Sequence, residues 1–395
     1  MIFMTKQQTV LTQGLVLLMA TATGIAVASN YYAQPLLDTI ASEFGLSHSS
    51  AGNIVTTAQL SYGIGLLFLV PLADRLERRK LIIVMSLFAT IGLLISGFST
   101  NLPWLLLGTA ITGLSSVVAQ VLLPLGATLA SDQQRGKVIG TIMGGLLLGI
   151  LLARVVSGGL SSMGSWRYIY WFASVAMFIT TLALARFLPS YHNNNDMSYR
   201  QILVSVFGLF VKEPILRYRS ILGMLSFALF SMFWTPLAFL LAKPPYEYSD
   251  ATIGLFGLVG VAGVFAATWA GKLADAGKGD LGTRLGLLSL LVSWVILFNA
   301  PMSLVALLIG VLLLDLAVQL VHVSNQNKIY ALHPDIRNRL TSAYMTCYFI
   351  GGAFGSWFSV MLYQHYEWTG VVMGATGIAL IACILDFTVR KHTPK

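Results

Sequence analysis

Apolar stretches that are each long enough to cross a membrane recur along the whole chain. A helix of about 20 residues, at about 1.5 Å per residue, spans the roughly 30 Å of hydrocarbon in a bilayer. Of the 395 residues, 56% are hydrophobic and only 10% are charged, which is typical of membrane proteins. Because backbone groups inside a bilayer must bond to one another, we expect α-helices. The sequence predicts twelve, near residues 11–33, 50–71, 80–99, 103–130, 137–160, 167–188, 218–242, 251–271, 285–299, 302–326, 340–363 and 370–388.

Basic residues fall almost wholly on one side of these predicted spans. Of the 24 Lys and Arg residues, all but Arg154, Arg167 and Lys243 lie in segments on the side of the N-terminus. Lys and Arg accumulate in cytoplasmic loops, so we expect both termini in the cytoplasm and the chain in a bacterial inner membrane. The net charge of +9 therefore reports topology. A nucleic-acid partner is not expected, because the bases are spread over many short segments.

Two similar segments indicate an internal repeat. Leu72-Ala73-Asp74-Arg75 in the first half corresponds to Leu273-Ala274-Asp275 in the second half. Each segment follows one apolar stretch and precedes another. In a membrane protein, such a repeat is typical of transporters whose two bundles rock about a site between them.

A polar stretch between the sixth and seventh spans divides the chain. We expect an N-terminal six-helix bundle over residues 1–188, a cytoplasmic linker over 189–217 and a C-terminal six-helix bundle over 218–395. Within the linker, the loose alternation of apolar and polar residues from Tyr199 to Phe210 predicts a short helix on the membrane surface.

The first of the paired segments resembles a family signature. Residues 70–79 are similar to Gly-x-Leu-Ala-Asp-Arg-x-Gly-Arg-Arg, the loop signature between spans two and three of the major facilitator superfamily, with Val70 and Glu77 replacing its glycines. The resemblance covers nearly the whole chain. It implies an all-α fold of two pseudo-symmetric six-helix bundles that transports small molecules by alternating access.

The fifth span resembles one branch of that family. Gly145 and Gly149 match part of the signature Gly-x-x-x-Gly-Pro-x-x-Gly-Gly of the twelve-span drug:proton antiporters, while Ile150 replaces its proline. In the fourth span the family usually has an arginine four residues before a glycine, and here Thr109 precedes Gly113. The resemblance to this branch implies exchange of an organic compound for protons, while Thr109 keeps a passive facilitator as an alternative.

The loop after the second span predicts a conformational latch. Asp74 lies four residues before Arg78, so that the two side chains can pair. In the family that the chain resembles, this cluster holds the cytoplasmic side in one conformation. The expected latch residues are Asp74, Arg75, Arg78, Arg79 and Asp275. The alternative is a positively charged loop with a capping aspartate.

Ionisable residues inside the predicted spans are candidates for proton coupling. Asp315 and His322 share one face of the tenth span with Gln319 and Gln326, because they follow helical spacing. A polar stripe on a helix in lipid must face the protein interior or a water-filled cavity. We expect Asp315, His322 and Arg154 to serve coupling. Asp315 can alternatively be structural or contact substrate, and Arg154 can snorkel to the outer surface or hold an anionic group.

Polar and aromatic residues in other spans predict a substrate cleft. Rings with a few polar groups suit amphipathic organic compounds, although each residue taken alone can instead be a packing residue or an interfacial anchor. The candidates are Asn30, Tyr31, Gln34, Gln59, Tyr62, Gln120, Trp234, Gln319, Tyr344 and Tyr348.

The predicted function is secondary active transport, as proton-coupled efflux of small organic compounds. A passive facilitator or a metabolite or sugar exporter without proton coupling is the alternative. The sequence has no phosphate-binding loop for an ATP-driven pump and no His-Glu-x-x-His motif for a metalloprotease. We therefore expect no enzymatic activity, cofactor or metal. The expected partners are a small-molecule substrate, protons and the lipid bilayer, and the expected state is a monomer.

Overall fold

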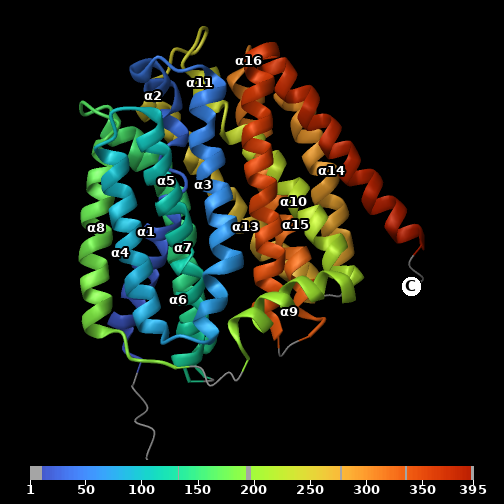
Figure 1. The fold of residues 1–395 in the computed structure, drawn as a ribbon. Helices are drawn as coiled ribbons and strands as arrows, with labels where there is room; N and C mark the ends of the chain where they lie inside the picture. The colour runs from blue at the N-terminus through green and yellow to red at the C-terminus, as the bar shows by residue number, and fades with distance from the viewer. Residues whose placement is uncertain (1–10, 132, 193–196, 276–277, 334–335, 393–395) are drawn as a thin grey trace, which may run out of the picture.

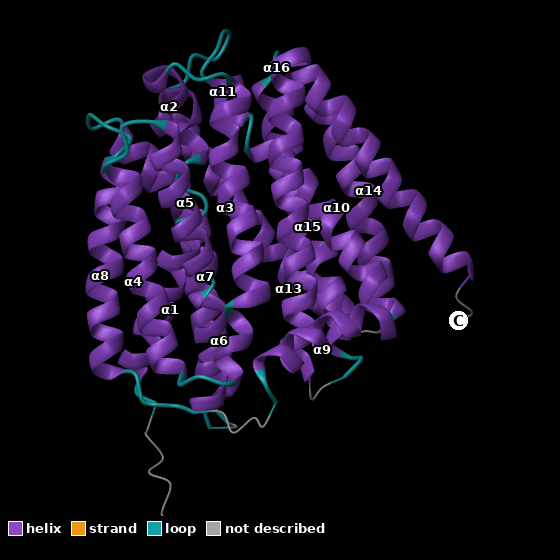
Figure 2. Cartoon of the chain, viewed as in Figure 1, coloured by secondary structure: helices purple, strands orange, loops and turns teal. Residues whose placement is uncertain are grey.

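The computed structural model describes the chain apart from a few short segments. Those segments are residues 1–10, 132, 193–196, 276–277, 334–335 and 393–395. The described residues form helices joined by loops (Figure 2).

The first half of the chain contains eight α-helices. They are α1 (Gln13–Ala28), α2 (Leu37–Phe44), α3 (His48–Phe68), α4 (Arg78–Gly97), α5 (Leu102–Ser116), α6 (Val118–Leu129), α7 (Arg135–Ser161) and α8 (Tyr168–Phe187), with short 3-10 helices η1 (Gln34–Leu36) and η2 (Val70–Asp74). Side chains of Thr12, Ser47 and Asn101 accept backbone N–H groups at the starts of α1, α3 and α5. These caps satisfy donors that the first helical turn leaves unpaired.

The rest of the chain begins with the linker helix and ends with a helical hairpin. Its helices are α9 (Tyr199–Lys212), α10 (Pro214–Trp234), α11 (Leu237–Leu241), α12 (Asp250–Leu255), η3 (Phe256–Gly260), α13 (Val261–Asp275), α14 (Gly279–Leu297), α15 (Leu304–Tyr330) and α16 (Arg337–His392). Within α16 the chain reverses direction at Glu367, which has a φ of 52° (Figure 1).

The predicted spans have helical counterparts in the structure. Nine helices in the described part of the chain are long and apolar enough to cross a membrane, and one of them, Arg339–Val389, holds the last two predicted spans. The first and eighth predicted spans fall on shorter apolar helices, Gln13–Ala28 and Asp250–Gly260. The all-α membrane architecture is therefore confirmed.

The linker helix is also present, with shifted bounds. The prediction of a helix from Tyr199 to Phe210 is confirmed by α9, which ends at Lys212. The next helix begins at Pro214, four residues earlier than the sequence suggested. Proline fits the first turn of a helix because its missing N–H would have no partner there.

The helices run between two ends of the molecule. Figure 1 shows α9 lying across one end, here named the linker end, and α2 and α11 at the opposite end, here named the far end. Helices α1–α8 are named the first half and α10–α16 the second half. The halves meet along two seams, where α3 packs against α16 and α7 packs against α12.

Candidate functional site

A cavity of about 1020 Å³ lies between the two halves. Arg154 of α7 and Asp315 of α15 line its inner part, whereas Asp74 and Arg339 line it near the linker end. Helix α9 also borders this central cavity near the linker end. The cavity therefore extends from the middle of the helices to the linker end.

At the far end, hydrogen bonds join the two halves. Thr39 Oγ1 of α2 donates to Asp250 Oδ1 and Oδ2 at 2.8 and 2.9 Å. Ser161 Oγ at the end of α7 donates to Asp250 Oδ2 at 2.5 Å. The Ser49 backbone N–H donates to Gln364 Oε1 of α16 at 3.0 Å. These contacts close the molecule opposite the open end of the cavity.

Burial affects one acid beside these contacts. Asp38 lies on α2, next to Thr39, and burial raises the pKa of its carboxyl. The charge of Asp250 also raises the pKa of Asp38, while His48 and Lys243 lower it. The far-end contact therefore includes a carboxyl that takes up a proton more readily than it does in water.

The polar stripe on α15 faces the central cavity. Asp315, Gln319, His322 and Gln326 all line it, so the prediction that this face avoids lipid is confirmed. His322 Nδ1 lies 3.0 Å from Tyr344 Oη, which fixes the orientation of the imidazole ring.

Arg154 is buried among aromatic rings at the inner part of the cavity. Its side chain is 3% exposed, and its Nε donates to Gln34 Oε1 at 2.7 Å. The guanidinium carbon lies 3.9 Å from the centre of a Trp234 ring and 5.0 Å from that of Tyr31. The snorkelling alternative for Arg154 is therefore wrong, because its charge faces the interior.

Trp234 contacts both charged residues of this inner part. Its Nε1 donates to Asp315 Oδ1 at 3.2 Å, while its ring covers Arg154. Asp315 is 5% exposed, and no ion pair joins it to Arg154 among the residues that the structure describes. The structure thus brings together Asp315, Trp234 and Arg154 from three different helices.

Half of the predicted cleft residues line the central cavity. Those that line it are Tyr31, Tyr62, Gln120, Gln319 and Tyr348. Gln120 Nε2 lies 3.5 Å from Tyr62 Oη, so these two polar groups contact each other across the cavity wall.

The other predicted cleft residues do not line it. Gln34, Trp234 and Tyr344 instead form hydrogen bonds with residues that line the cavity. Their partners are Arg154, Asp315 and His322 respectively. Gln59 is fully buried, and neither of its amide atoms has a hydrogen-bond partner among the described residues. Asn30 borders a different cavity. A polar residue in a span can point into its own bundle, which is why residue type alone misplaced these side chains.

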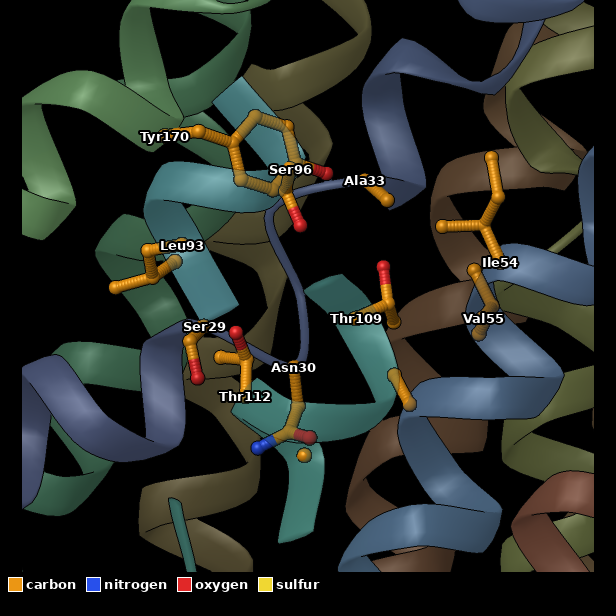
Figure 3. Close-up of a pocket in the computed structure, with 12 residues that line it drawn as sticks. Ser29, Asn30, Ala33, Ile54, Val55, Leu93, Ser96, Thr109, Thr112 and Tyr170 are labelled. Atoms are coloured by element: carbon orange, nitrogen blue, oxygen red, sulfur yellow. The ribbon is translucent and has the colours of Figure 1, made fainter. Parts of the chain in front are cut away.

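That second cavity lies within the first half. It has a volume of about 10 Å³, room for one water molecule, and Asn30, Thr109 and Thr112 line it (Figure 3). Thr109 Oγ1 donates to the Leu105 carbonyl at 2.7 Å. Asn30 Oδ1 and Thr112 Oγ1 are buried, and neither has a hydrogen-bond partner in the described chain. Asn30 therefore belongs to this small polar cavity.

Aromatic residues that the sequence argument missed also line the central cavity. Phe227 and Phe230 of α10 and Phe349 of α16 are among them. Phenylalanine in a membrane span is expected in lipid as often as in the interior. Phe227, Phe230 and Trp234 are spaced by three and four residues, as on one face of a helix. This spacing is the signal that could have placed Phe227 and Phe230 on the same inward face.

The expected latch residues have different environments. Arg78 Nη2 lies 3.8 Å from Asp74 Oδ1, so the predicted pair forms, although Asp74 ends η2 and Arg78 begins α4 rather than sharing a helical turn. Arg79 donates to the Ala185 carbonyl, and Arg75 is exposed. The side chain of Asp275 lies outside the part of the chain that the structure describes.

Metal ligands do not gather anywhere in the described chain. No group of three or more His, Cys, Asp or Glu side chains that could hold a metal ion occurs among the described residues. The chemistry of the central cavity is that of charged, amide and aromatic side chains.

Comparisons with known proteins identify the fold and the family. Residues 19–352 match the model of the Major Facilitator Superfamily. The chain is 57% identical over 378 residues to "uncharacterized transporter YgaY" of Escherichia coli O157:H7, covering 96% of each protein. It resembles the nucleoside transporter NupG (TM-score 0.77, 14% identity, 95% of this chain and 98% of that one). It also resembles a bacterial homolog of the human lysosomal transporter Spinster (TM-score 0.75, 14% identity, 98% of each chain).

Three comparisons agree with one another. They are a family model that matches most of the chain, a relative matched over 96% of its length, and solved structures with the same architecture. They also agree with a central cavity between two helical halves. The chain therefore belongs to the Major Facilitator Superfamily and is a multi-pass membrane transporter, not an enzyme.

Proposed function

We propose that the chain is a secondary active transporter that exports small organic compounds by alternating access and couples this export to protons. The observation that carries the proposal is the central cavity of about 1020 Å³, which has the buried Asp315 carboxyl at its inner part. Burying an ionisable side chain at this depth costs free energy, so such a residue in a membrane protein usually serves a function.

Alternating access is supported by the asymmetry of the two ends. The cavity reaches the linker end, while Asp250 and its partners join the halves at the far end. We place the linker end and both termini in the cytoplasm of a bacterial inner membrane, because the basic loops lie on that side. In this orientation the structure faces inward, as does the Spinster homolog, which was crystallised inward-facing and unoccupied.

The moving units in this proposal are the two bundles of residues 1–188 and 218–395, tethered by the linker 189–217. Rocking of one bundle against the other would open the far-end contacts and close the cavity near the Asp74–Arg78 pair, the proposed latch. A single chain supplies both walls of the cavity, so the proposed working unit is a monomer.

Proton coupling is assigned to Asp315, with His322 as the next group along the α15 face toward the linker end. Both side chains line the cavity and can meet water that enters it. A carboxyl that is exposed to each side of the membrane in turn can bind a proton on one side and release it on the other. A passive facilitator is the alternative. Thr109 is uncharged, stands where the family usually has an arginine, and lines the small polar cavity.

Vesicle transport tests this proposal. In proteoliposomes with an imposed pH gradient, a pH-sensitive dye reports proton movement as each member of a panel of organic compounds is added. A substrate should move protons through the wild type and not through Asp315→Asn. The control is Asp386→Asn, which alters another buried carboxyl that does not line the cavity. Transport without proton movement, unchanged by Asp315→Asn, would leave the facilitator instead.

A further inference from the structure

At the inner part of the central cavity, one guanidinium nitrogen of Arg154 has no hydrogen-bond acceptor among the described residues. Resting on the proposed transport function, we propose that Arg154 is the anion-binding group of the substrate site, and that the substrate is an organic anion with an aromatic or other apolar body. A carboxylate is the simplest acceptor of this kind.

The hydrogen bonds of Arg154 leave part of its guanidinium available. Nε donates to Gln34, but Nη2 is buried and has no hydrogen-bond partner in the part of the chain that the structure describes. A buried charged donor that stays unpaired is costly, and an acceptor supplied by a ligand removes that cost. Arg154 lines the cavity, so such a ligand lies beside the guanidinium, and contact with the buried Nη2 requires only that neighbouring side chains shift.

The rings around Arg154 determine which kind of group it can accept. Trp234 and Tyr31 lie against the guanidinium at 3.9 and 5.0 Å. Aromatic rings attract the guanidinium charge but accept no strong N–H hydrogen bond, so the N–H edge keeps its preference for oxygen acceptors. Carboxylates match this edge because two oxygens can accept two parallel N–H groups.

Asp315 does not fill that role. Its Oδ1 accepts the Trp234 indole N–H, and no ion pair joins it to Arg154 in the described chain. The two charges instead contact the same indole ring from different directions. Asp315 therefore leaves the Arg154 edge open to an acceptor from a ligand in the cavity.

The charges along the cavity favour an anion. Four arginines, Arg78, Arg135, Arg154 and Arg339, line it together with only two aspartates, Asp74 and Asp315, among the described residues. A cleft lined with an excess of one charge concentrates ligands of the opposite charge. This distribution disfavours organic cations, which an aromatic lining alone would accept.

An apolar surface suited to the body of the ligand lies next to Arg154. The Phe230 ring centre is 5.8 Å from the guanidinium carbon. Phe227 lies 5.3 Å from Phe230 and 4.0 Å from Tyr348, centre to centre. All three rings line the cavity, so an aromatic body can stack beside them while its anionic group contacts Arg154.

Binding of three related probes tests the proposal. The probes share one naphthalene ring and carry a carboxylate, a neutral amide or an ammonium group. Titration calorimetry with the full-length protein in lipid nanodiscs should show that the carboxylate binds at least about tenfold more tightly than the amide, and the ammonium probe most weakly. This ranking is read from the wild type and needs no variant.

Variants then locate the preference. Arg154→Gln should reduce the ratio of carboxylate to amide affinity to near one, and Arg154→Lys should retain only part of it, because lysine lacks the planar fork. Arg186→Gln is the matched control, since Arg186 is exposed at the end of α8 and does not line the cavity. Thermal unfolding of each variant verifies that it is folded.

Two outcomes would overturn the inference: an ammonium probe that binds as tightly as the carboxylate, or a carboxylate preference that survives Arg154→Gln in folded protein. Neither outcome depends on proton movement. Carboxylate binding without transport would refute the proposed function and leave the anion site, whereas proton-coupled transport of cations alone would refute the anion site.

Discussion

Gly145 and Gly149 of α7 allow this helix to touch α1. A Cβ atom at Gly149 would lie 2.3 Å from the Gly24 carbonyl oxygen, and one at Gly145 would lie 2.3 Å from that of Ala20. Backbone atoms cannot yield as a flexible side chain can. The glycines are therefore packing residues where α7, the helix that carries Arg154, contacts α1 within the first half.

Alanine substitutions measure this close contact. Gly149→Ala should destabilise the protein by about 1–3 kcal/mol, because the helices must separate to admit the methyl group. Gly144→Ala is the control in the same helix, since its Cβ would meet nothing within 4 Å. It should be neutral or slightly stabilising, because alanine favours helix more than glycine does. Thermal unfolding in one detergent compares the two, and equal melting temperatures would contradict the packing role.

The position of a side chain was predictable from sequence where the helix left it one choice. Asp315 and His322 had to face inward, because most of the residues around them on α15 are apolar and lipid excludes charge. Asn30 could have faced either the central cavity or the interior of the first half. It lines the small cavity inside the first half. The partners of Arg154 and Asp315 were not predictable as pairs, because Gln34 is 120 residues from Arg154 and Trp234 is 81 residues from Asp315.

Three short segments meet at Asp250 in the far-end contact: α2, the end of α7 and the start of α12. The Asp250 carboxylate, at the start of α12, accepts hydrogen bonds from the hydroxyl groups of Thr39 on α2 and Ser161 on α7. The sequence predicted the long spans from their apolar length, but not this contact. Hydroxyl and carboxyl side chains at helix ends are common, and only the packing of the halves brings these three together.

Loss of one hydroxyl should loosen that contact. A hydrogen bond to a charged group contributes about 1.5–3 kcal/mol, so Ser161→Ala should move the ratio of closed to open far ends by about tenfold or more. Spin labels on α2 and on the loop before α12 report the distance between the halves. Ser162→Ala is the matched control, because Ser162 donates only within its own helix, to the Gly159 carbonyl. If the two variants give the same distance distribution, Asp250 does not hold the far end closed.

At the scale of the whole molecule, the fold and the state have different origins. The two halves, the twelve predicted stretches and the family follow from apolar length and the repeated Leu-Ala-Asp segment. Which end is closed does not follow from sequence, because both states of an alternating-access protein would use the same helices. The closed end depends on small differences in contact energy between the halves, and such differences respond to conditions.

Acidity on the far side is one such condition. Burial, followed by the charge of Asp250, raises the pKa of Asp38 above its ordinary value of 3.8 in this closed arrangement, although His48 and Lys243 oppose the rise. An opened far end would expose Asp38 to water and return its pKa toward that value. The closed state then binds the proton more tightly than the open state does. Between 3.8 and the raised pKa, a fall in pH should therefore increase the closed population, and the gain should vanish as pH rises above that window.

Spin-label distances between the halves, measured across a pH series, should show this change in the wild type and lose most of it in Asp38→Asn. A closed population that falls on acidification, or a pH response unchanged in Asp38→Asn, would rule out Asp38 as the group responsible.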